Sequence, residues 1–227
     1  MIHLVIIGAN GRMGRRLVAL AELDENLCVT ASVGRDDASP ANVDADVVID
    51  FSTPKGTRRA LAIAADLECA LLVGTTGLPR EIAEEMGMFA RSHPVMVAPN
   101  LAPGVAICKR LVTDAVRAMS PDVEVDLVEI HHRGKRDRPS GTALALAAAI
   151  EAEFEGALPA DRIDSIRRGT VIGEHRIILK GPDEEIEIVH RAASRDLFAR
   201  GALRAASWLS GQPAGRYAVE DMLDSPA

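Results

Sequence analysis

An apolar stretch followed by three evenly spaced glycines, at the start of the chain, constrains the fold more than any other feature. Residues Ile2 to Ile7 are mostly apolar and predict a buried strand, because the run is short and a glycine bounds it. Gly8, Gly11 and Gly14 follow, then a helical pattern, then a second predicted strand from Leu27 to Val33. A strand, a glycine turn, a helix and a strand within about thirty residues form the unit that binds dinucleotides.

The glycines are useful to such a unit for a physical reason. They let the backbone turn tightly and approach a pyrophosphate, and the helix start offers its N–H groups to the same anion. The spacing here is G-x-x-G-x-x-G, whereas G-x-G-x-x-G is commoner. A glycine-rich turn that holds no ligand is therefore the alternative interpretation of this segment.

The end of the second strand, Val33 to Asp37, bears on the form of the cofactor. Gly34 stands where an acidic residue would hold the ribose hydroxyls of NAD, and Arg35 follows it. An arginine without that acid favours the 2′-phosphate of NADP, although Asp36 or Asp37 lies close enough in sequence to reach the ribose. We expect NADP or NAD as cofactor, with NADP preferred.

Strand and helix patterns then alternate along the chain. Predicted strands are Asp46 to Phe51, Ala70 to Val73 and Val95 to Ala98, and predicted helices are Lys55 to Glu68 and Pro79 to His93. This alternation predicts an α/β fold with a Rossmann-type doubly wound parallel sheet. Turns rich in Gly, Thr or Asn follow these strands, and ligands of such sheets bind at the carboxyl ends of strands.

A second, smaller α+β domain with a mixed sheet is expected after the segment Leu101 to Gly104, which we interpret as a hinge. Helices are predicted at Val105 to Met119 and Ser140 to Phe154, strands at Val123 to Ile130, Thr170 to Ile172, Glu174 to Lys180 and Glu185 to His190, and irregular chain at Glu155 to Arg168. A helix from Asp196 to Leu209 is expected to rejoin the first domain, and Asp224 to Ala227 to fray. The predicted dinucleotide-binding domain is thus 1–101 with 198–227, and the substrate-binding and oligomerisation domain is 102–197.

The segment Glu129 to Thr142 concentrates groups that can perform chemistry. His131 and His132 are adjacent at the end of a predicted strand, and Lys135 follows them. A helix begins directly after, with Ser140 or Thr142 as its predicted cap. Imidazoles carry protons near neutral pH, and a helix start beside a lysine receives carboxylate or phosphate.

This segment has two alternative interpretations, a solvated turn and a metal site. A basic loop between a strand and a helix is often only a solvated turn. Metal binding is not expected, because His131 and His132 would point apart on an extended chain. His175 and His190 are interpreted as satisfied residues of the second sheet.

Composition excludes some classes of function. The chain of 227 residues carries 26 basic and 33 acidic side chains, and only 3% of its residues are aromatic, which disfavours nucleic-acid binding. Cys28, Cys69 and Cys108 are scattered and form no CxxC pair, as expected for free thiols in a reducing compartment. No signal peptide and no apolar run of membrane-spanning length is recognised, so we expect a cytoplasmic protein without a membrane partner.

The chain resembles the 4-hydroxy-tetrahydrodipicolinate reductase family, formerly called dihydrodipicolinate reductases. The most specific matching motif is the His-His-x-x-Lys-x-Asp-x-Pro-Ser-Gly-Thr run. The other matching segments are Gly8 to Gly14, Val48 to Ser52, Gly74 to Gly77, Pro99-Asn100, Glu129-Ile130, Gly173 to His175 and Trp208-Leu209. The resemblance implies a cytoplasmic, usually tetrameric oxidoreductase of lysine and diaminopimelate biosynthesis. Such an enzyme reduces 4-hydroxy-tetrahydrodipicolinate, a small cyclic dicarboxylate, to tetrahydrodipicolinate with NADH or NADPH.

The resemblance also implies roles for individual residues. His131 would be the acid/base residue, Lys135 a proton donor, and His132 a substrate contact. The start of the following helix, at Ser140, Gly141 and Thr142, would bind a substrate carboxylate. The implied cofactor-binding residues are Gly8, Ala9, Asn10, Gly11, Arg12, Met13, Arg35, Gly74, Thr75, Thr76, Ala98, Pro99, Asn100 and Leu101.

The chain departs from the family pattern at a few positions. Gly34 replaces an acid that some members carry, which again favours NADP. Leu101-Ala102-Pro103 replaces the usual Phe-Ser-x after Asn100, and Arg138 replaces a small alanine. Two alternative functions remain: another two-domain nicotinamide-dependent dehydrogenase, and a non-catalytic NAD(P)-sensing module. Neither would require the paired imidazoles and lysine in this arrangement.

Overall fold

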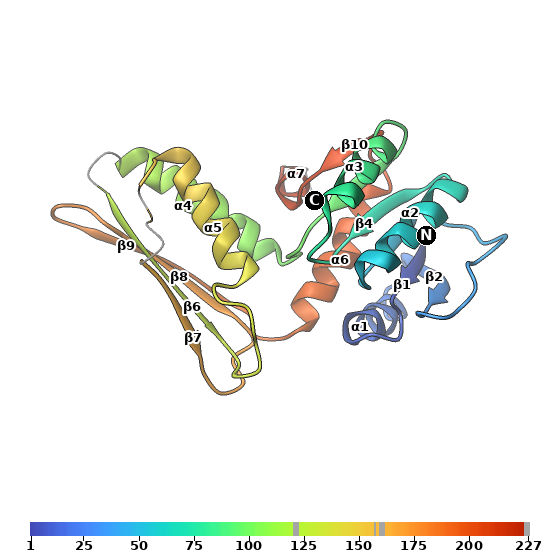
Figure 1. The fold of residues 1–227 in the computed structure, drawn as a ribbon, viewed down its shortest axis with the longest axis horizontal. Coiled ribbons are helices and arrows are strands. Elements are labelled where there is room, and N and C mark those ends of the chain that lie inside the picture. The colour runs from blue at the N-terminus through green and yellow to red at the C-terminus, as the bar shows by residue number, and fades with distance from the viewer. Residues whose placement is uncertain (120–122, 157, 159–161, 225–227) are drawn as a thin grey trace. The chain divides into compact units, whose positions relative to one another are not determined.

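The chain forms two compact units in the computed structural model, which describes residues 1–119, 123–156, 158 and 162–224 (Figure 1). The first unit comprises Met1–Ala102 and Asp196–Ala227, and the second comprises Pro103–Arg195. These bounds differ by one or two residues from the prediction, in which the first domain ends at residue 101 and resumes at residue 198. The functional roles assigned to the two domains stay predictions.

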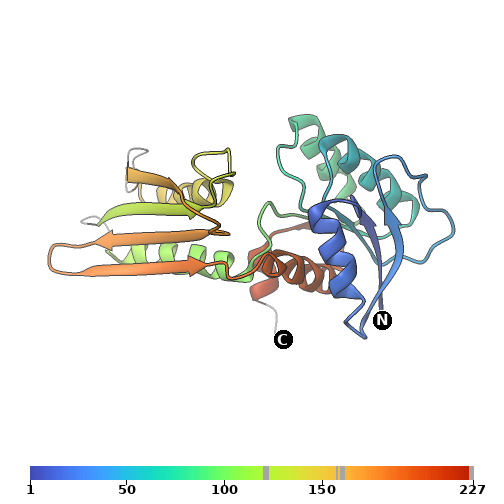
Figure 2. The same ribbon diagram turned by 90° about the horizontal axis from the view of Figure 1, so that it is seen from below.

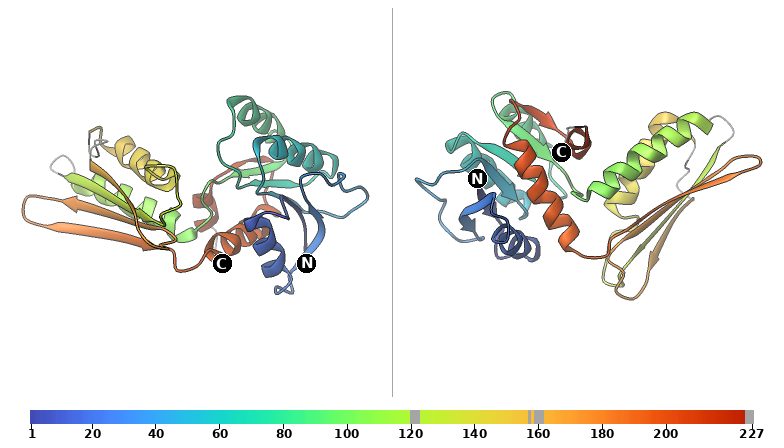
Figure 3. Two further views of the ribbon diagram at one scale, coloured as in Figure 1. Left: turned by 60° about the horizontal axis from the view of Figure 1, so that its bottom comes forward. Right: turned by 180° about the vertical axis from the view of Figure 1, so that it is seen from behind.

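A six-stranded, wholly parallel sheet forms the centre of the first unit, in the order β10-β5-β4-β3-β1-β2. Its strands are β1 (Ile2–Ile7), β2 (Leu27–Val33), β3 (Val47–Asp50), β4 (Ala70–Val73), β5 (Pro94–Val97) and β10 (Gly215–Tyr217). Its helices are α1 (Arg12–Ala21), α2 (Pro54–Asp66), α3 (Arg80–Phe89), α6 (Asp196–Leu209) and α7 (Val219–Leu223). Helices α2 and α3 cover one face of the sheet, and α1 and α6 cover the other (Figures 1 and 3). The predicted doubly wound α/β fold is therefore confirmed.

Burial on both faces explains the composition of the central strands. Every residue of β3 and of β4 is buried, as expected for parallel strands between two helix layers. The α6 side is lined by small residues, among them Ala202 and Ala206, both fully buried. Small side chains allow α6 to lie close to both α1 and the sheet, so the alanine-rich face of this helix is its core face.

The end of the chain contains two elements that the sequence did not predict. Strand β10 pairs in parallel with β5, and the short helix α7 follows it. Three residues are too few to produce a detectable period, so β10 is recognised only by its partner. The Tyr217 ring meets Trp208 of α6 edge to face, with ring centroids 5.3 Å apart. Of the predicted frayed end, residues 225–227 lie outside the described residues.

The second unit is a four-stranded mixed sheet with two helices on one face (Figure 2). Its elements are α4 (Pro103–Met119), β6 (Glu124–His131), α5 (Gly141–Glu153), β7 (Ile163–Arg167), β8 (Glu174–Lys180) and β9 (Glu185–Arg191). In the order β7-β6-β8-β9, β7 is parallel to β6 and the other pairs are antiparallel. Alternate strand residues such as Leu127 and Ile177 face the helices and form the core with Leu146 and Ile150.

The sequence prediction was wrong about one strand of this sheet. Residues Ile163–Arg167 form β7 inside the segment predicted to be irregular, whereas Thr170 to Ile172 form no strand. The register pairs Leu127 with Ile163 and His131 with Arg167, so the helix-facing positions of β7 include Ser165 and Arg167. A strand that turns polar side chains inward lacks the apolar alternation on which the prediction relied. Arg167 finds its ionic partner on β6, which the sequence of β7 does not reveal.

Two further expectations concern the chain as a whole. Cys28, Cys69 and Cys108 are free thiols, as predicted, and burial raises the pKa of Cys69 to about 11. None of the helices in the described ranges combines the length and apolarity that crossing a membrane requires.

Candidate active site

The residues predicted to bind the cofactor follow the carboxyl ends of strands in the parallel sheet. Residues 8–13 follow β1, Arg35 follows β2, residues 74–76 follow β4, and residues 98–101 follow β5. Because all of these strands run in parallel, their carboxyl ends lie at one edge of the sheet. Strand order reverses at β1, which lies between β3 and β2, and ligands of such sheets bind at this kind of switch point.

The glycine turn after β1 has the geometry of an anion cradle. Gly8 has φ of +81°, and a Cβ there would lie 2.3 Å from the carbonyl oxygen of Phe51. A Cβ at Gly14 would lie 2.2 Å from the carbonyl oxygen of Gly8, so only glycine lets α1 approach the turn. Gly11 is the N-cap of α1, and no side chain caps the helix. An uncapped helix start behind a tight glycine turn fits the pyrophosphate of a dinucleotide.

A buried carboxylate, which the sequence reasoning missed, ties two strand ends of this edge together. Asp50 is fully buried and accepts hydrogen bonds from Thr57 Oγ1 at 2.6 Å, Thr75 Oγ1 at 2.8 Å and the Ser52 hydroxyl. Thr75 also accepts from the Ser52 N–H at 2.8 Å. Burial raises the pKa of Asp50, although the three hydroxyls act in the opposite direction. The network fixes the turn after β4, where the predicted residues Gly74 and Thr75 lie.

The end of β2, where cofactor preference was predicted to be decided, is braced by two side chains. The Gly34 N–H donates to Asp37 Oδ2 at 2.7 Å, and Arg59 Nη1 donates to the Gly34 carbonyl at 3.2 Å. A Cβ at Gly34 would lie 2.4 Å from Asn10 Nδ2. Asp37 is therefore engaged with the backbone of the strand end, while Arg35 is exposed.

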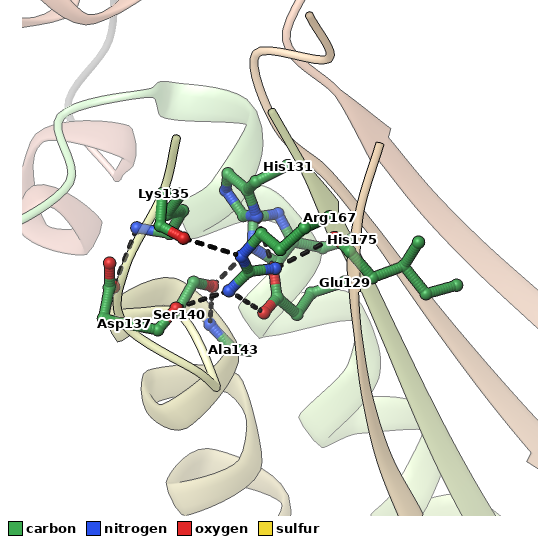
Figure 4. A network of polar contacts seen from close by, with 9 residues as sticks. Glu129, His131, Lys135, Asp137, Ser140, Ala143, Arg167 and His175 are labelled. Carbon is green, nitrogen blue, oxygen red and sulfur yellow. Dashed lines mark hydrogen bonds and ion pairs between the residues drawn. The ribbon is translucent and has the colours of Figure 1, made fainter. Parts of the chain in front are cut away.

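In the second unit, a polar cluster lies at the carboxyl end of β6 (Figure 4). The strand register places Glu129 opposite His175 of β8 and His131 opposite Arg167 of β7. Glu129 is fully buried, and its Oε1 accepts from Arg167 Nη2 at 2.8 Å. Its Oε2 is hydrogen-bonded to Nδ1 of His131. The Arg167 side chain is 3% exposed, so this is a buried ion pair.

Burial and charge together set the protonation states in this cluster. Burial opposes ionisation of Glu129, but hydrogen bonds led by that from Arg167 outweigh it and lower its pKa. Burial lowers the pKa of His131, partly offset by the Glu129 carboxylate. Burial also lowers the pKa of His175, to about 4. At neutral pH the cluster therefore holds an ionised carboxylate between a guanidinium and a neutral imidazole.

The loop that carries Lys135 is held by the same arginine. Arg167 donates from Nε to the carbonyl of Lys135 at 3.3 Å and from Nη2 to the carbonyl of Asp137. Lys135 Nζ forms an ion pair with Asp137 Oδ2 at 2.7 Å, and its side chain is 23% exposed. The Lys135 N–H donates to the carbonyl of His132 at 3.1 Å. The lysine is thus placed beside His131 by backbone contacts while its ammonium stays accessible.

The start of α5 faces the same cluster. Ser140 is the N-cap, because its Oγ accepts from the Ala143 N–H at 3.1 Å, which decides between the two predicted caps. The same hydroxyl lies 3.1 Å from Nε2 of His175. A Cβ at Gly141 would have no heavy atom within 4 Å outside its chain neighbours and helix backbone. First-turn N–H groups lack intrahelical acceptors, so this end can receive a carboxylate.

The two other histidines of the second unit differ from the prediction that they are satisfied residues of the sheet. The Nδ1 atoms of His175 and His190 are both buried and have no hydrogen-bond partner among the described residues. With His131 they form a row of rings across β6, β8 and β9, at centroid separations of 5.3 Å and 6.5 Å. The described residues contain no cluster of three or more His, Cys, Asp or Glu side chains that could hold a metal ion.

Two family descriptions match this chain in succession. "Dihydrodipicolinate reductase, N-terminus" matches residues 2–101, and "Dihydrodipicolinate reductase, C-terminus" matches residues 104–223. The chain belongs to the dihydrodipicolinate reductase family. The resemblance inferred from the sequence motifs is therefore confirmed.

Curated relatives align with nearly the whole length of this family member. A 4-hydroxy-tetrahydrodipicolinate reductase from Anaeromyxobacter dehalogenans (strain 2CP-1 / ATCC BAA-258) is 36% identical, with 98% of each chain aligned. An enzyme of the same name from Stenotrophomonas maltophilia (strain R551-3) is 41% identical, again over 98% of each chain.

Solved structures share the fold. A dipicolinate-bound dihydrodipicolinate reductase from Paenisporosarcina sp. TG-14 superposes with a TM-score of 0.82 at 22% identity, covering 97% of this chain and 99% of that one. A probable dehydrogenase from Thermotoga maritima reaches a TM-score of 0.61 at 10% identity, covering 97% and 92% of the two chains. These likenesses show that the chain shares the fold of these structures.

Proposed function

We propose that this protein is the NAD(P)H-dependent reductase that converts 4-hydroxy-tetrahydrodipicolinate to tetrahydrodipicolinate in lysine and diaminopimelate biosynthesis. The observation that carries the proposal is the family match over both halves of the chain. The polar cluster of the second unit supplies what a dicarboxylate substrate requires, namely a lysine, a histidine and a helix start together.

In the second unit, some residues bind the substrate and others transfer protons. Lys135 and the first-turn N–H groups of Gly141 and Thr142 bind the substrate carboxylates, and two-point binding fixes the face of the ring that reacts. The C4 hydroxyl of the substrate leaves as water, and reduced nicotinamide, when bound, then supplies the hydride to C4 of the resulting dihydro ring. Lys135 donates a proton to the carbon next to C4. His131, which is neutral at neutral pH, acts as the acid/base residue of the site. His132, which is partly exposed, contacts substrate.

A coupled assay tests this activity. Purified protein is mixed with freshly generated 4-hydroxy-tetrahydrodipicolinate, and nicotinamide absorbance is followed with NADPH and with NADH in separate reactions. The expected result is substrate-dependent loss of absorbance, with tetrahydrodipicolinate identified by mass spectrometry. Cofactor oxidation only with a different amino-acid or sugar substrate would instead identify another dehydrogenase.

Cofactor preference is proposed to be for NADP. Gly34 supplies no carboxylate of its own, Arg35 is exposed beside it, and Asp37 is occupied by the Gly34 N–H. We expect Arg35→Ala to lower kcat/KM for NADPH about tenfold while changing that for NADH little, because only NADPH carries the phosphate. Tenfold better use of NADH by the unaltered protein would contradict the preference.

We also propose that the protein assembles as a homotetramer and that it is located in the cytoplasm. Among the described elements, no helix covers the face of the second sheet opposite to α4 and α5. That face carries Val128, Ile130, Ile166 and Ile178 between ion pairs such as that of Lys180 with Asp126. An apolar stripe with charges around it is typical of an interface between identical subunits.

A further inference from the structure

The contacts of Glu129 determine which of its oxygens meets which neighbour. Oε1 accepts from Arg167 and Oε2 is bonded to His131 Nδ1, so each oxygen has its own partner. Arginine can only donate, and an ionised carboxylate can only accept. The His131 nitrogen that faces Glu129 must therefore carry a hydrogen. In the neutral ring, the proton is consequently on Nδ1 and Nε2 has none.

The opposite side of the His131 ring is kept clear by a glycine. A Cβ at position 173 would lie 3.1 Å from His131 Nε2, which is tighter than ordinary contact. Gly173, which directly precedes β8, has no such atom, so it places no side chain against Nε2. The ring is otherwise held in a packed environment, since His131 is 8% exposed and meets His175 edge to face.

We propose that Glu129 is a positioning residue, oriented by Arg167, that holds neutral His131 with its proton on Nδ1 and a bare Nε2. This inference rests on the proposed catalytic role of His131. The bare nitrogen is the atom that can accept a proton during turnover, and the carboxylate stabilises the imidazolium that then forms. Arg167 also donates hydrogen bonds to backbone carbonyls of the loop that carries Lys135. One buried guanidinium thus aligns both proposed proton carriers.

Exchange of Glu129 for glutamine makes the inference testable. In Glu129→Gln the amide oxygen is expected to face Arg167, which only donates, so the amide NH2 faces His131 Nδ1. Nδ1 must then accept, and the proton moves to Nε2. The variant therefore keeps the size of the side chain but presents the wrong tautomer. A loss of general acid–base function lowers kcat by about 10²-fold or more, with little change of substrate KM.

The matched control is Glu153→Gln. Glu153 also pairs with an arginine within this unit, Arg117, at 2.9 Å, but its hydrogen bonds involve no histidine. We expect this variant to keep wild-type kcat and the wild-type pH profile. Melting temperatures of both variants show whether loss of the buried charge also lowers stability.

Nitrogen-15 NMR of histidine-labelled protein reads the tautomer directly and needs no substrate. The chain has six histidines, and a His131→Gln difference spectrum assigns the relevant ring. In wild-type protein above the titration of His131, the expected tautomer has Nδ1 protonated, and in Glu129→Gln it has Nε2 protonated. A wild-type ring protonated on Nε2 overturns the inference, even if the variant does not fold.

The pH profile gives a second readout. His131 is faced by Glu129 on its own strand, Lys135 in the following loop, Arg167 on β7 and His175 on β8. Of these, only Glu129 favours the imidazolium, so its neutralisation moves the His131 titration and the acid limb of kcat to lower pH. An unchanged limb, or more than a third of wild-type kcat, overturns the inference. If wild-type protein shows no reductase activity, the proposed function fails, while the NMR measurement still decides the role of Glu129.

Discussion

At the scale of single residues, one of the two proposed proton carriers is buried and the other is accessible. His131 is buried with a buried carboxylate behind it, whereas Lys135 is partly exposed and paired with Asp137, which is half exposed. An exposed ion pair exchanges easily, because solvent competes for both charges. A substrate carboxylate can therefore replace Asp137 at the ammonium, while Glu129 stays with His131.

Replacement of Lys135 tests its double role in binding and protonation. We expect Lys135→Ala to lose about 3–4 kcal/mol of transition-state stabilisation, the value of one electrostatic donor. That corresponds to a fall in kcat/KM of roughly 10²- to 10³-fold. Steady-state kinetics measure it, and a variant with more than a third of wild-type turnover would refute the role. Asp137→Asn, which leaves the ammonium in place, is the control and should remain active.

His175 makes the stability of the fold depend on pH. Its pKa falls from 6.5 in the unfolded chain to about 4 in the folded one, so the unfolded state binds the proton more readily. Stability is complete above pH 6.5 and falls as pH decreases towards 4, by up to roughly 3 kcal/mol. Urea unfolding at pH 7 and pH 5 should show this loss in wild-type protein and in the control His3→Gln, which leaves His175 in place. His175→Gln should lose less between the two pH values, and an equal loss would show that another group is responsible.

At the scale of elements, the start of α5 has a structural role and a proposed binding role. Ser140 caps the helix and contacts His175, while Gly141, the first helical residue, is exposed. Ser140 and Thr142 in the sequence were enough to predict a helix beginning here, because capping is a local interaction. Strand β7 was not predictable in the same way, because its inward-facing Arg167 is stable only with Glu129 of β6 beside it.

Gly141→Ala separates these two functions. The added methyl meets no heavy atom outside its own surroundings, and Ala restricts the unfolded chain, so stability should be unchanged or higher by about 0.4–1 kcal/mol. The same methyl projects into the space in which a carboxylate would approach the helix start, so KM for the substrate should rise at least tenfold. Kinetics and thermal melts measure the two effects. Gly87→Ala in α3, where the nearest atom is Arg216 Nη1 at 4.0 Å, is the control with unchanged KM.

At the scale of the whole molecule, two units with different kinds of sheet divide the chain. The parallel sheet is covered by helices on both faces, and the mixed sheet is covered on only one among the described elements. Ile166 lies on the uncovered face and is 41% exposed. A surface of this kind is a cost to a monomer and is stabilised by association.

Replacement of Ile166 tests the proposed tetramer. Lysine at this position would place an unpaired charge in the interface, so Ile166→Lys should sediment as a smaller species than wild-type protein at the same concentration. Circular dichroism checks that the subunit is still folded. The control Ile107→Lys changes an isoleucine that is 47% exposed on α4, on the other side of the sheet, and should leave the assembly intact. Monomeric wild-type protein at working concentration would contradict the tetramer.

The sequence by itself determined the doubly wound fold, the glycine turn and a helix start capped by Ser140 or Thr142. Periodicity, φ-permissive glycines and capping are interactions of neighbouring residues, so they can be recognised without a partner. Only the tertiary structure decided the pairing of Glu129 with Arg167, which lie 38 residues apart, and the place of β10 beside β5. A buried charge is stable only where its counter-charge arrives from another strand, and that meeting depends on strand order and register. The motif therefore named His131 and Lys135, whereas the side chains that hold them in position became visible only in the folded chain.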